Sequence, residues 1–95
     1  MEVRRLAVVG TGLIGASVAL AAKRAGIREV VGYDPERQAL DAAVERGAVD
    51  SGTTSLAEAV ADAELAVVAA PVAQLAPQVR AVLEASAEGC TVTET

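Results

Sequence analysis

The sequence contains no histidine, phenylalanine or tryptophan, and it has one tyrosine and one cysteine among 95 residues. Histidine is the side chain that most often transfers protons near neutral pH, so its absence leads us to assign no catalytic residue, and we assign no metal ligand. A lone Cys90 cannot form an internal disulfide, and an unpaired thiol is typical of the reducing cytoplasm, where we expect the protein. Because 53% of the residues are hydrophobic and only Tyr33 is aromatic, we expect a core of alanine, valine, leucine and isoleucine.

The sequence is short of positive charge and of long apolar runs. Eight lysines and arginines against thirteen acidic residues give a net charge of -5, which opposes binding to a phosphate backbone and excludes nucleic acid as an expected partner. No apolar run approaches the roughly 20 residues of a membrane span, so we expect a soluble protein with no membrane partner. At this length we expect one domain, residues 1–95.

Short apolar runs alternate with segments of helical periodicity. Strands are predicted at 6–9, 30–33, 48–50, 65–70 and 91–95. Helices are predicted at 13–25, from Pro35 to the residue before Gly47, after Ser55, and from Pro77 to the residue before Gly89. This alternation predicts a parallel α/β sheet of about five strands with right-handed crossovers, with strand order 3-2-1-4-5 and helices on both faces.

Finer features of these elements are also predicted. We expect 51–54 to form a polar turn, and Ser55 and Glu58 to form a capping box. Gly26 is expected to end the first helix. The predicted inward faces of the first two helices are Ile14, Val18, Ala21, Ala22 and Ala25, and then Leu40, Ala43 and Val44.

A glycine-rich sequence connects the first strand to the first helix. Gly10-Thr11-Gly12-Leu13-Ile14-Gly15 matches G-x-G-x-x-G, in which the glycines allow a tight turn, close approach of a pyrophosphate, and close packing of helix on strand. Glycines used only for turning are the alternative. The position between strand and helix favours a Rossmann-type domain that binds NAD, with these six residues at the cofactor.

An acidic residue follows at the distance that this motif requires. Asp34 ends the second strand 19 positions after Gly15, and its carboxylate is expected to accept hydrogen bonds from the adenosine ribose. We include Tyr33 in the predicted site. The alternative for Asp34 is that it only caps the helix that Pro35 opens. For Arg37, stacking on adenine and a solvated position are equally open.

The fourth strand is followed by Ala70-Pro71-Val72. The carboxyl end of this strand is expected to face the crevice that holds the nicotinamide half of the cofactor, so we include these three residues in the site. The alternative is that Pro71 only ends the strand.

The segment Gly12-Leu13-Ile14-Gly15-Ala16-Ser17-Val18-Ala19 resembles the prephenate dehydrogenase family, which includes arogenate dehydrogenases. Gly32-Tyr33-Asp34, Gly47-Ala48-Val49-Asp50 and Ala70-Pro71-Val72 are similar to that family too, whereas Ala16 stands where its members typically have a glycine. The resemblance implies a tyrosine-biosynthesis enzyme that decarboxylates prephenate or arogenate oxidatively, with hydride transfer to NAD. It also implies that the catalytic histidine and the helical dimerisation and substrate domain lie beyond Thr95, so we expect residues 1–95 to be inactive alone.

Two other functions remain open at this stage. One is a stand-alone module that senses NAD or a related nucleotide. The other is the cofactor domain of another oxidoreductase related to the β-hydroxyacid dehydrogenases, although Leu13-Ile14-Gly15 with Ser17 favours the prephenate group. We also expect 91–95 to be an edge strand with unpaired backbone groups, through which the chain can self-associate.

Overall fold

The computed structural model describes residues 3–69, 72–86 and 89–94, and they form a five-stranded parallel sheet with the order β3-β2-β1-β4-β5. The strands are β1 (Arg5–Val9), β2 (Glu29–Tyr33), β3 (Ser51–Thr53), β4 (Leu65–Val68) and β5 (Thr91–Glu94). The helices are α1 (Leu13–Arg24), α2 (Arg37–Glu45), α3 (Leu56–Val60) and α4 (Val72–Ala85). The predicted fold class and strand order are therefore confirmed. None of the described helices is long and apolar enough to cross a membrane.

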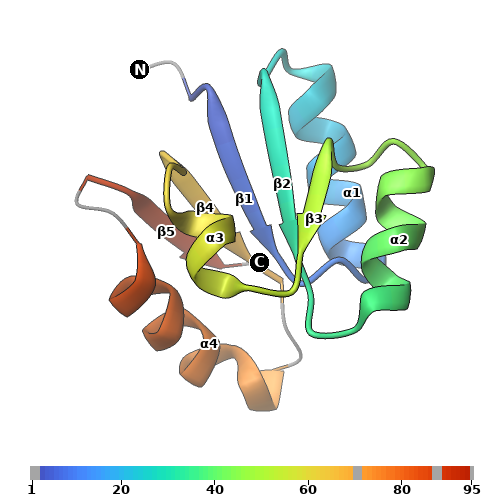
Figure 1. The fold of residues 1–95 in the computed structure, drawn as a ribbon. Coiled ribbons are helices and arrows are strands. Elements are labelled where there is room, and N and C mark those ends of the chain that lie inside the picture. The colour runs from blue at the N-terminus through green and yellow to red at the C-terminus, as the bar shows by residue number, and fades with distance from the viewer. Residues whose placement is uncertain (1–2, 70–71, 87–88, 95) are drawn as a thin grey trace.

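The helices cover the two faces of the sheet in pairs (Figure 1). α1 and α2 pack against β1, β2 and β3 on one face, and α3 and α4 lie together on the other face. The chain adds β2 and β3 on one side of β1 and then β4 and β5 on the other side. The strand order therefore reverses between β1 and β4, which are neighbours in the sheet. In open α/β sheets, a crevice suited to a ligand lies at the carboxyl ends of the two strands where this change occurs.

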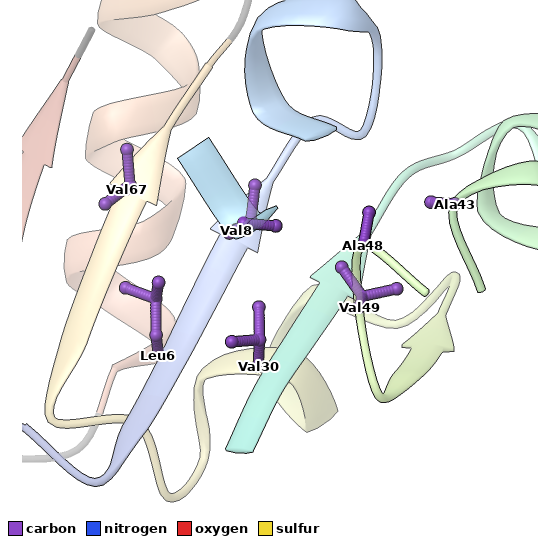
Figure 2. Packing of buried hydrophobic residues seen from close by; sticks show 8 residues of the cluster. Leu6, Val8, Val30, Ala43, Ala48, Val49 and Val67 are labelled. Carbon is purple, nitrogen blue, oxygen red and sulfur yellow. The ribbon is translucent and has the colours of Figure 1, made fainter. Parts of the chain in front are cut away.

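The core consists of two layers of small apolar side chains, one on each face of the sheet. On the face of α1 and α2, Leu6 and Val8 of β1 lie between Val67 of β4 and Val30 of β2 (Figure 2). The opposite layer alternates along the same strands and includes Ala7, Val9, Ala66 and Val68, together with Val60 of α3 and Val82 of α4. Each buried valine or leucine contributes about 1.5 to 3 kcal/mol to folding. Because these side chains are small, the helices must pack close to the sheet to bury them.

The third strand lies three residues later than the sequence predicted. Ala48 and Val49 are buried in the loop before it, and the backbone N–H of Asp50 donates to the Val30 carbonyl at 2.8 Å. The ladder with β2 pairs Val31 with Ser51, so the predicted polar turn is in fact the strand. Glycine at position 52 is suited to this place because a Cβ atom there would lie 2.9 Å from Cδ2 of the buried Leu40 on α2.

Two helices begin elsewhere than predicted. α2 begins at Arg37, not at Pro35, because the backbone N–H of Glu36 donates to the Asp34 carboxylate at 2.9 Å in a turn before the helix. α4 begins at Val72, and Pro77 lies within it. Proline there removes one helical hydrogen bond, but Leu75 before it and Val79 and Val82 after it pack on the core and hold the helix on both sides of that point.

The inward faces of α1 and α2 were predicted only in part. On α1, Ala19 is fully buried and Ala21 is exposed, as is Ala25, which follows the helix. The helix meets the sheet along the line that runs from Gly15. On α2, Leu40 and Ala43 are buried as predicted but Val44 is 42% exposed. The side chain of Ile14 lies outside the described residues.

The predicted ends of two helices are confirmed, one completely and one in part. Gly26 follows α1 with a positive φ of 95°, a conformation that favours glycine after a helix. At α3, Ser55 Oγ accepts from the Glu58 backbone N–H at 3.3 Å, but the Glu58 carboxylate accepts from the Thr53 hydroxyl at 3.0 Å. Ser55 thus caps the helix as predicted, but the Glu58 carboxylate is bound by the Thr53 hydroxyl and not by the Ser55 backbone N–H.

Candidate functional site

The glycine-rich loop leaves β1 through a turn that requires glycine. Gly10 has a φ of 101°, and a Cβ atom at this position would overlap the carbonyl oxygen of Ala69, which follows β4. The Gly10 N–H donates to the Tyr33 carbonyl at the end of β2, with a distance of 2.7 Å. The loop is therefore held between the carboxyl ends of β2 and β4.

Gly15 allows α1 to pack directly on this loop. A Cβ atom at position 15 would overlap the Gly10 carbonyl oxygen, and it would also lie 3.3 Å from Cγ1 of Val8 on β1. The third glycine of the motif therefore has the packing role that the sequence predicted for it.

Gly12 has the opposite surroundings. It is exposed, it precedes α1 as the N-cap residue, and a Cβ atom there would meet no atom of the described residues within 4 Å. Within the described part of the chain no side chain caps this helix, so its first amides keep the partial positive charge of a helix N-terminus. This opening is the place where an anionic group can approach the backbone.

Asp34 lies beside the loop and is bound to it. One carboxylate oxygen, Oδ2, accepts from the backbone N–H of Thr11 at 3.0 Å and from its hydroxyl at 3.2 Å. The other, Oδ1, accepts from the Glu36 N–H. The structure therefore brings together the two predicted halves of the site, and it shows that Asp34 is attached to the loop as well as to the turn before α2.

The remaining predicted residues lie at the borders of this site or outside the description. The Tyr33 side chain is half-buried and packs on the core beneath α3, so Tyr33 holds the loop through its carbonyl. Arg37 is the first residue of α2, with 70% of its side chain exposed, and it pairs with Asp41 at 3.6 Å. Ala70 and Pro71 lie outside the described residues, as do the side chains of Leu13, Ile14 and Val72.

Sequence reasoning missed the contribution of Gly32. A Cβ atom there would lie 2.9 Å from Cγ2 of Thr11 and 3.1 Å from Cγ1 of Val49. Glycine in the interior of a strand often marks a close approach of another segment, and that signal was present in the sequence. Gly32 thus leaves the space in which the Thr11 side chain sits.

An uncapped helix N-terminus beside an acidic strand end defines an α/β domain of the nucleotide-binding class. The chain belongs to the family described as the nucleotide-binding domain of prephenate dehydrogenase, whose sequence profile matches residues 18–95. The glycine-rich loop precedes the matched range. None of the curated proteins compared with this sequence matches it.

Solved dehydrogenases share the fold over nearly the whole chain. The arogenate dehydrogenase of Synechocystis is 27% identical with a TM-score of 0.88, over 96% of this chain and 32% of its own. The prephenate dehydrogenase of A. aeolicus, solved with hydroxyphenyl propionate and NAD+, is 26% identical with a TM-score of 0.87, over 99% and 34%. The 3-hydroxyisobutyrate dehydrogenase of Mycobacterium tuberculosis, at 24% identity, a TM-score of 0.81 and coverage of 98% and 31%, shows the fold alone. This chain spans about a third of the length of each.

Proposed function

We propose that this chain binds NAD as the cofactor domain of a dehydrogenase that acts on prephenate or arogenate. The observation that carries the proposal is the open N-terminus of α1 above Gly12, next to the Asp34 carboxylate at the end of β2. Membership of the prephenate dehydrogenase nucleotide-binding family supports it. The similar A. aeolicus enzyme was solved with NAD+.

Each part of the dinucleotide has a place in this proposal. The pyrophosphate lies at the loop residues Gly10, Thr11, Gly12, Leu13, Ile14 and Gly15, with the first amides of α1 directed at it. The adenosine ribose donates to Asp34 and the adenine lies near Arg37 and Tyr33. The nicotinamide half lies past β4 at Ala70, Pro71 and Val72. When bound, NAD supplies the hydride acceptor for a substrate that loses carbon dioxide.

The charge of Asp34 is our reason for proposing NAD instead of NADP. The carboxylate is half-buried and already oriented by its backbone partners. A free ribose hydroxyl can donate to it, whereas the 2′-phosphate of NADP would bring a second anion to a partly desolvated carboxylate. Repulsion and a lost hydrogen bond both disfavour NADP.

Calorimetric titration with NAD and with NADP tests this proposal. Hydrogen bonds to a charged group contribute about 1.5 to 3 kcal/mol, so we expect Asp34→Ala to weaken NAD binding by roughly 10- to 150-fold and NADP binding far less. Asp62→Ala is the control, because it removes an exposed carboxylate near the start of β1, at the amino ends of the strands and so at the opposite end from Asp34.

Two results would contradict the role of Asp34 in binding. One is equal affinity of the unaltered chain for NAD and NADP. The other is a loss of about 1 kcal/mol of stability in Asp34→Ala with no change in cofactor preference, which is the result expected of a residue that only caps the turn.

The proposal extends to the protein in which this domain acts. We infer that residues 1–95 are one domain and that the catalytic histidine, the substrate-binding residues and the dimerisation segments belong to another, because the chain covers about a third of the dehydrogenases that it resembles. We also propose a role in tyrosine biosynthesis, which fits that family, and a cytoplasmic location. We expect no turnover of prephenate or arogenate by this chain alone, and NADH formation above a blank without protein would contradict that expectation.

Self-association through the last strand belongs to the proposal as well. β5 is an edge of the sheet and three of its four residues are exposed. Beside it, a groove of about 500 Å³ between α4 and β5 includes Leu83, which is 59% exposed, together with Arg80 and Glu94. The groove contains both a positive and a negative side chain, so a second copy of the chain can present charges of the opposite sign to each.

Sedimentation should show a dimer whose share rises with concentration and falls in Thr93→Lys, since lysine blocks edge pairing. A strict monomer at high concentration would exclude it.

A further inference from the structure

Thr11 lies inside the glycine-rich loop, but its side chain faces the sheet. It is 6% exposed, and among the residues whose burial the structure describes it is the one polar side chain that is buried. A buried hydroxyl is almost always hydrogen-bonded, and this one donates to Asp34 Oδ2. The Thr11 side chain therefore lies against the sheet and is directed at Asp34, and it does not point toward the opening at Gly12.

The methyl group of Thr11 fixes the direction of that hydroxyl. Cγ2 occupies the space left by the missing side chain of Gly32, where a Cβ atom would come within 2.9 Å of it. Rotation about χ1 is already restricted in a β-branched residue, and with the methyl group in this space the hydroxyl has one direction. Gly32 and Thr11 therefore act as a pair that aims a donor at Asp34.

The hydrogen bonds of Asp34 leave a defined acceptor for a ligand. A carboxylate has about four acceptor positions, two on each oxygen. Oδ2 receives both donors of Thr11, and Oδ1 receives the Glu36 N–H. With respect to the described residues, the remaining position is thus on Oδ1, and the carboxylate is held by two donors on one oxygen and by one on the other.

We infer that Thr11 is a positioning residue that sets cofactor choice, because its hydroxyl holds the Asp34 carboxylate in the orientation that accepts a ribose hydroxyl. The inference rests on the proposed role of Asp34 in NAD binding. A carboxylate that is oriented before the ligand arrives loses little entropy on binding and cannot turn away from a 2′-phosphate. Without the Thr11 hydroxyl, the carboxylate keeps only backbone donors and gains freedom to rotate.

The test compares Thr11→Val, which removes the hydroxyl, with Thr11→Ser, which keeps it. We expect Thr11→Val to lower the ratio of NAD to NADP affinity about tenfold, and Thr11→Ser to retain the ratio of the unaltered chain. Thr91→Val is the matched control, because it makes the same change at an exposed position at the start of β5. In a chain that carries Asp34→Ala, Thr11→Val should have no further effect on the ratio, since Thr11 acts through that carboxylate.

Hydrogen exchange without cofactor provides a second measurement. The amides of Thr11 and Glu36 both donate to Asp34, so both should exchange faster in Thr11→Val than in Thr11→Ser. Unchanged cofactor preference in a Thr11→Val chain that binds NAD overturns the inference and leaves the proposed function intact. A tenfold drop that persists in the Asp34→Ala background also overturns it. Absence of NAD binding by the unaltered chain overturns the proposed function and this inference together.

Discussion

Gly12 and Gly15 belong to one motif, but the structure predicts opposite results when each is replaced by alanine. At position 15 the added methyl group would overlap the Gly10 carbonyl oxygen and crowd Val8. The obstacle is backbone, so it cannot rotate away. At position 12 the methyl group would meet nothing within 4 Å among residues 3–69, 72–86 and 89–94, so the fold should accept it.

The expected magnitudes follow from these surroundings. Alanine inside a helix is favoured over glycine by about 1 kcal/mol, but overpacking costs about 1 to 3 kcal/mol or more, and an overlap with backbone stands at the upper end. We therefore expect Gly15→Ala to lose about 2 kcal/mol, or roughly 8 to 16 °C in Tm for a domain of this size. For Gly12→Ala we expect a change within about 1 kcal/mol, from the poorer N-cap.

Thermal melting and calorimetry on both variants separate folding from binding. Gly12→Ala should melt close to the unaltered chain yet bind NAD about tenfold or more weakly, because its methyl group occupies the space through which a pyrophosphate approaches. The reasoning is refuted if Gly15→Ala is as stable as the unaltered chain, or if Gly12→Ala binds NAD with full affinity.

Two further predictions concern stability. The pKa of Asp50 is held below its ordinary value by the hydrogen bond from Lys23, by the Val30 N–H and by the charge of Lys23. The contribution of Asp50 to folding stability is therefore complete above a pH of about 4 and is lost as the pH falls through the folded-state pKa. We expect Asp50→Asn to cost about 1 kcal/mol or less at pH 7, since the pair is partly exposed, and the difference should vanish in acid denaturation curves; a constant difference would contradict this. Leu40 is 1% exposed, and we expect Leu40→Ala to lose about 2 to 5 kcal/mol of stability in urea unfolding. Val44 is 42% exposed, and Val44→Ala should change the stability by no more than about 1 kcal/mol. Equal losses would contradict the assigned inward face of α2.

The sheet order and the loop could be predicted because they depend on local patterns. Apolar runs that end in glycine, followed by helical spacing, predict parallel strands with crossovers. Gly10, Gly12 and Gly15 at the end of the first strand then predict where the ligand site lies. Each of these signals extends over a few consecutive residues and does not depend on tertiary contacts, so the sequence alone contains them.

The errors arose where distant residues decide local structure. Asp50 donates its N–H to Val30, 20 residues earlier, and this contact moves the third strand to 51–53. The sequence predicted that a helix begins at Pro77, whereas α4 continues on both sides of this proline because its side chains pack on the sheet. The bonds from Thr11 to Asp34 span 23 positions, and no spacing rule along the chain predicts them.

An NMR titration of the isotopically labelled chain with NAD can show whether the cofactor binds at the glycine-rich loop and Asp34. We expect saturable shifts of the backbone amides at Gly10, Thr11, Gly12 and Gly15 and at Asp34, with far smaller shifts on addition of an equal amount of NADP. Amides of β5 at the sheet edge should not move with NAD. Shifts confined to other parts of the sheet, or no saturable shift at the loop and Asp34, would contradict the claim that this site binds NAD.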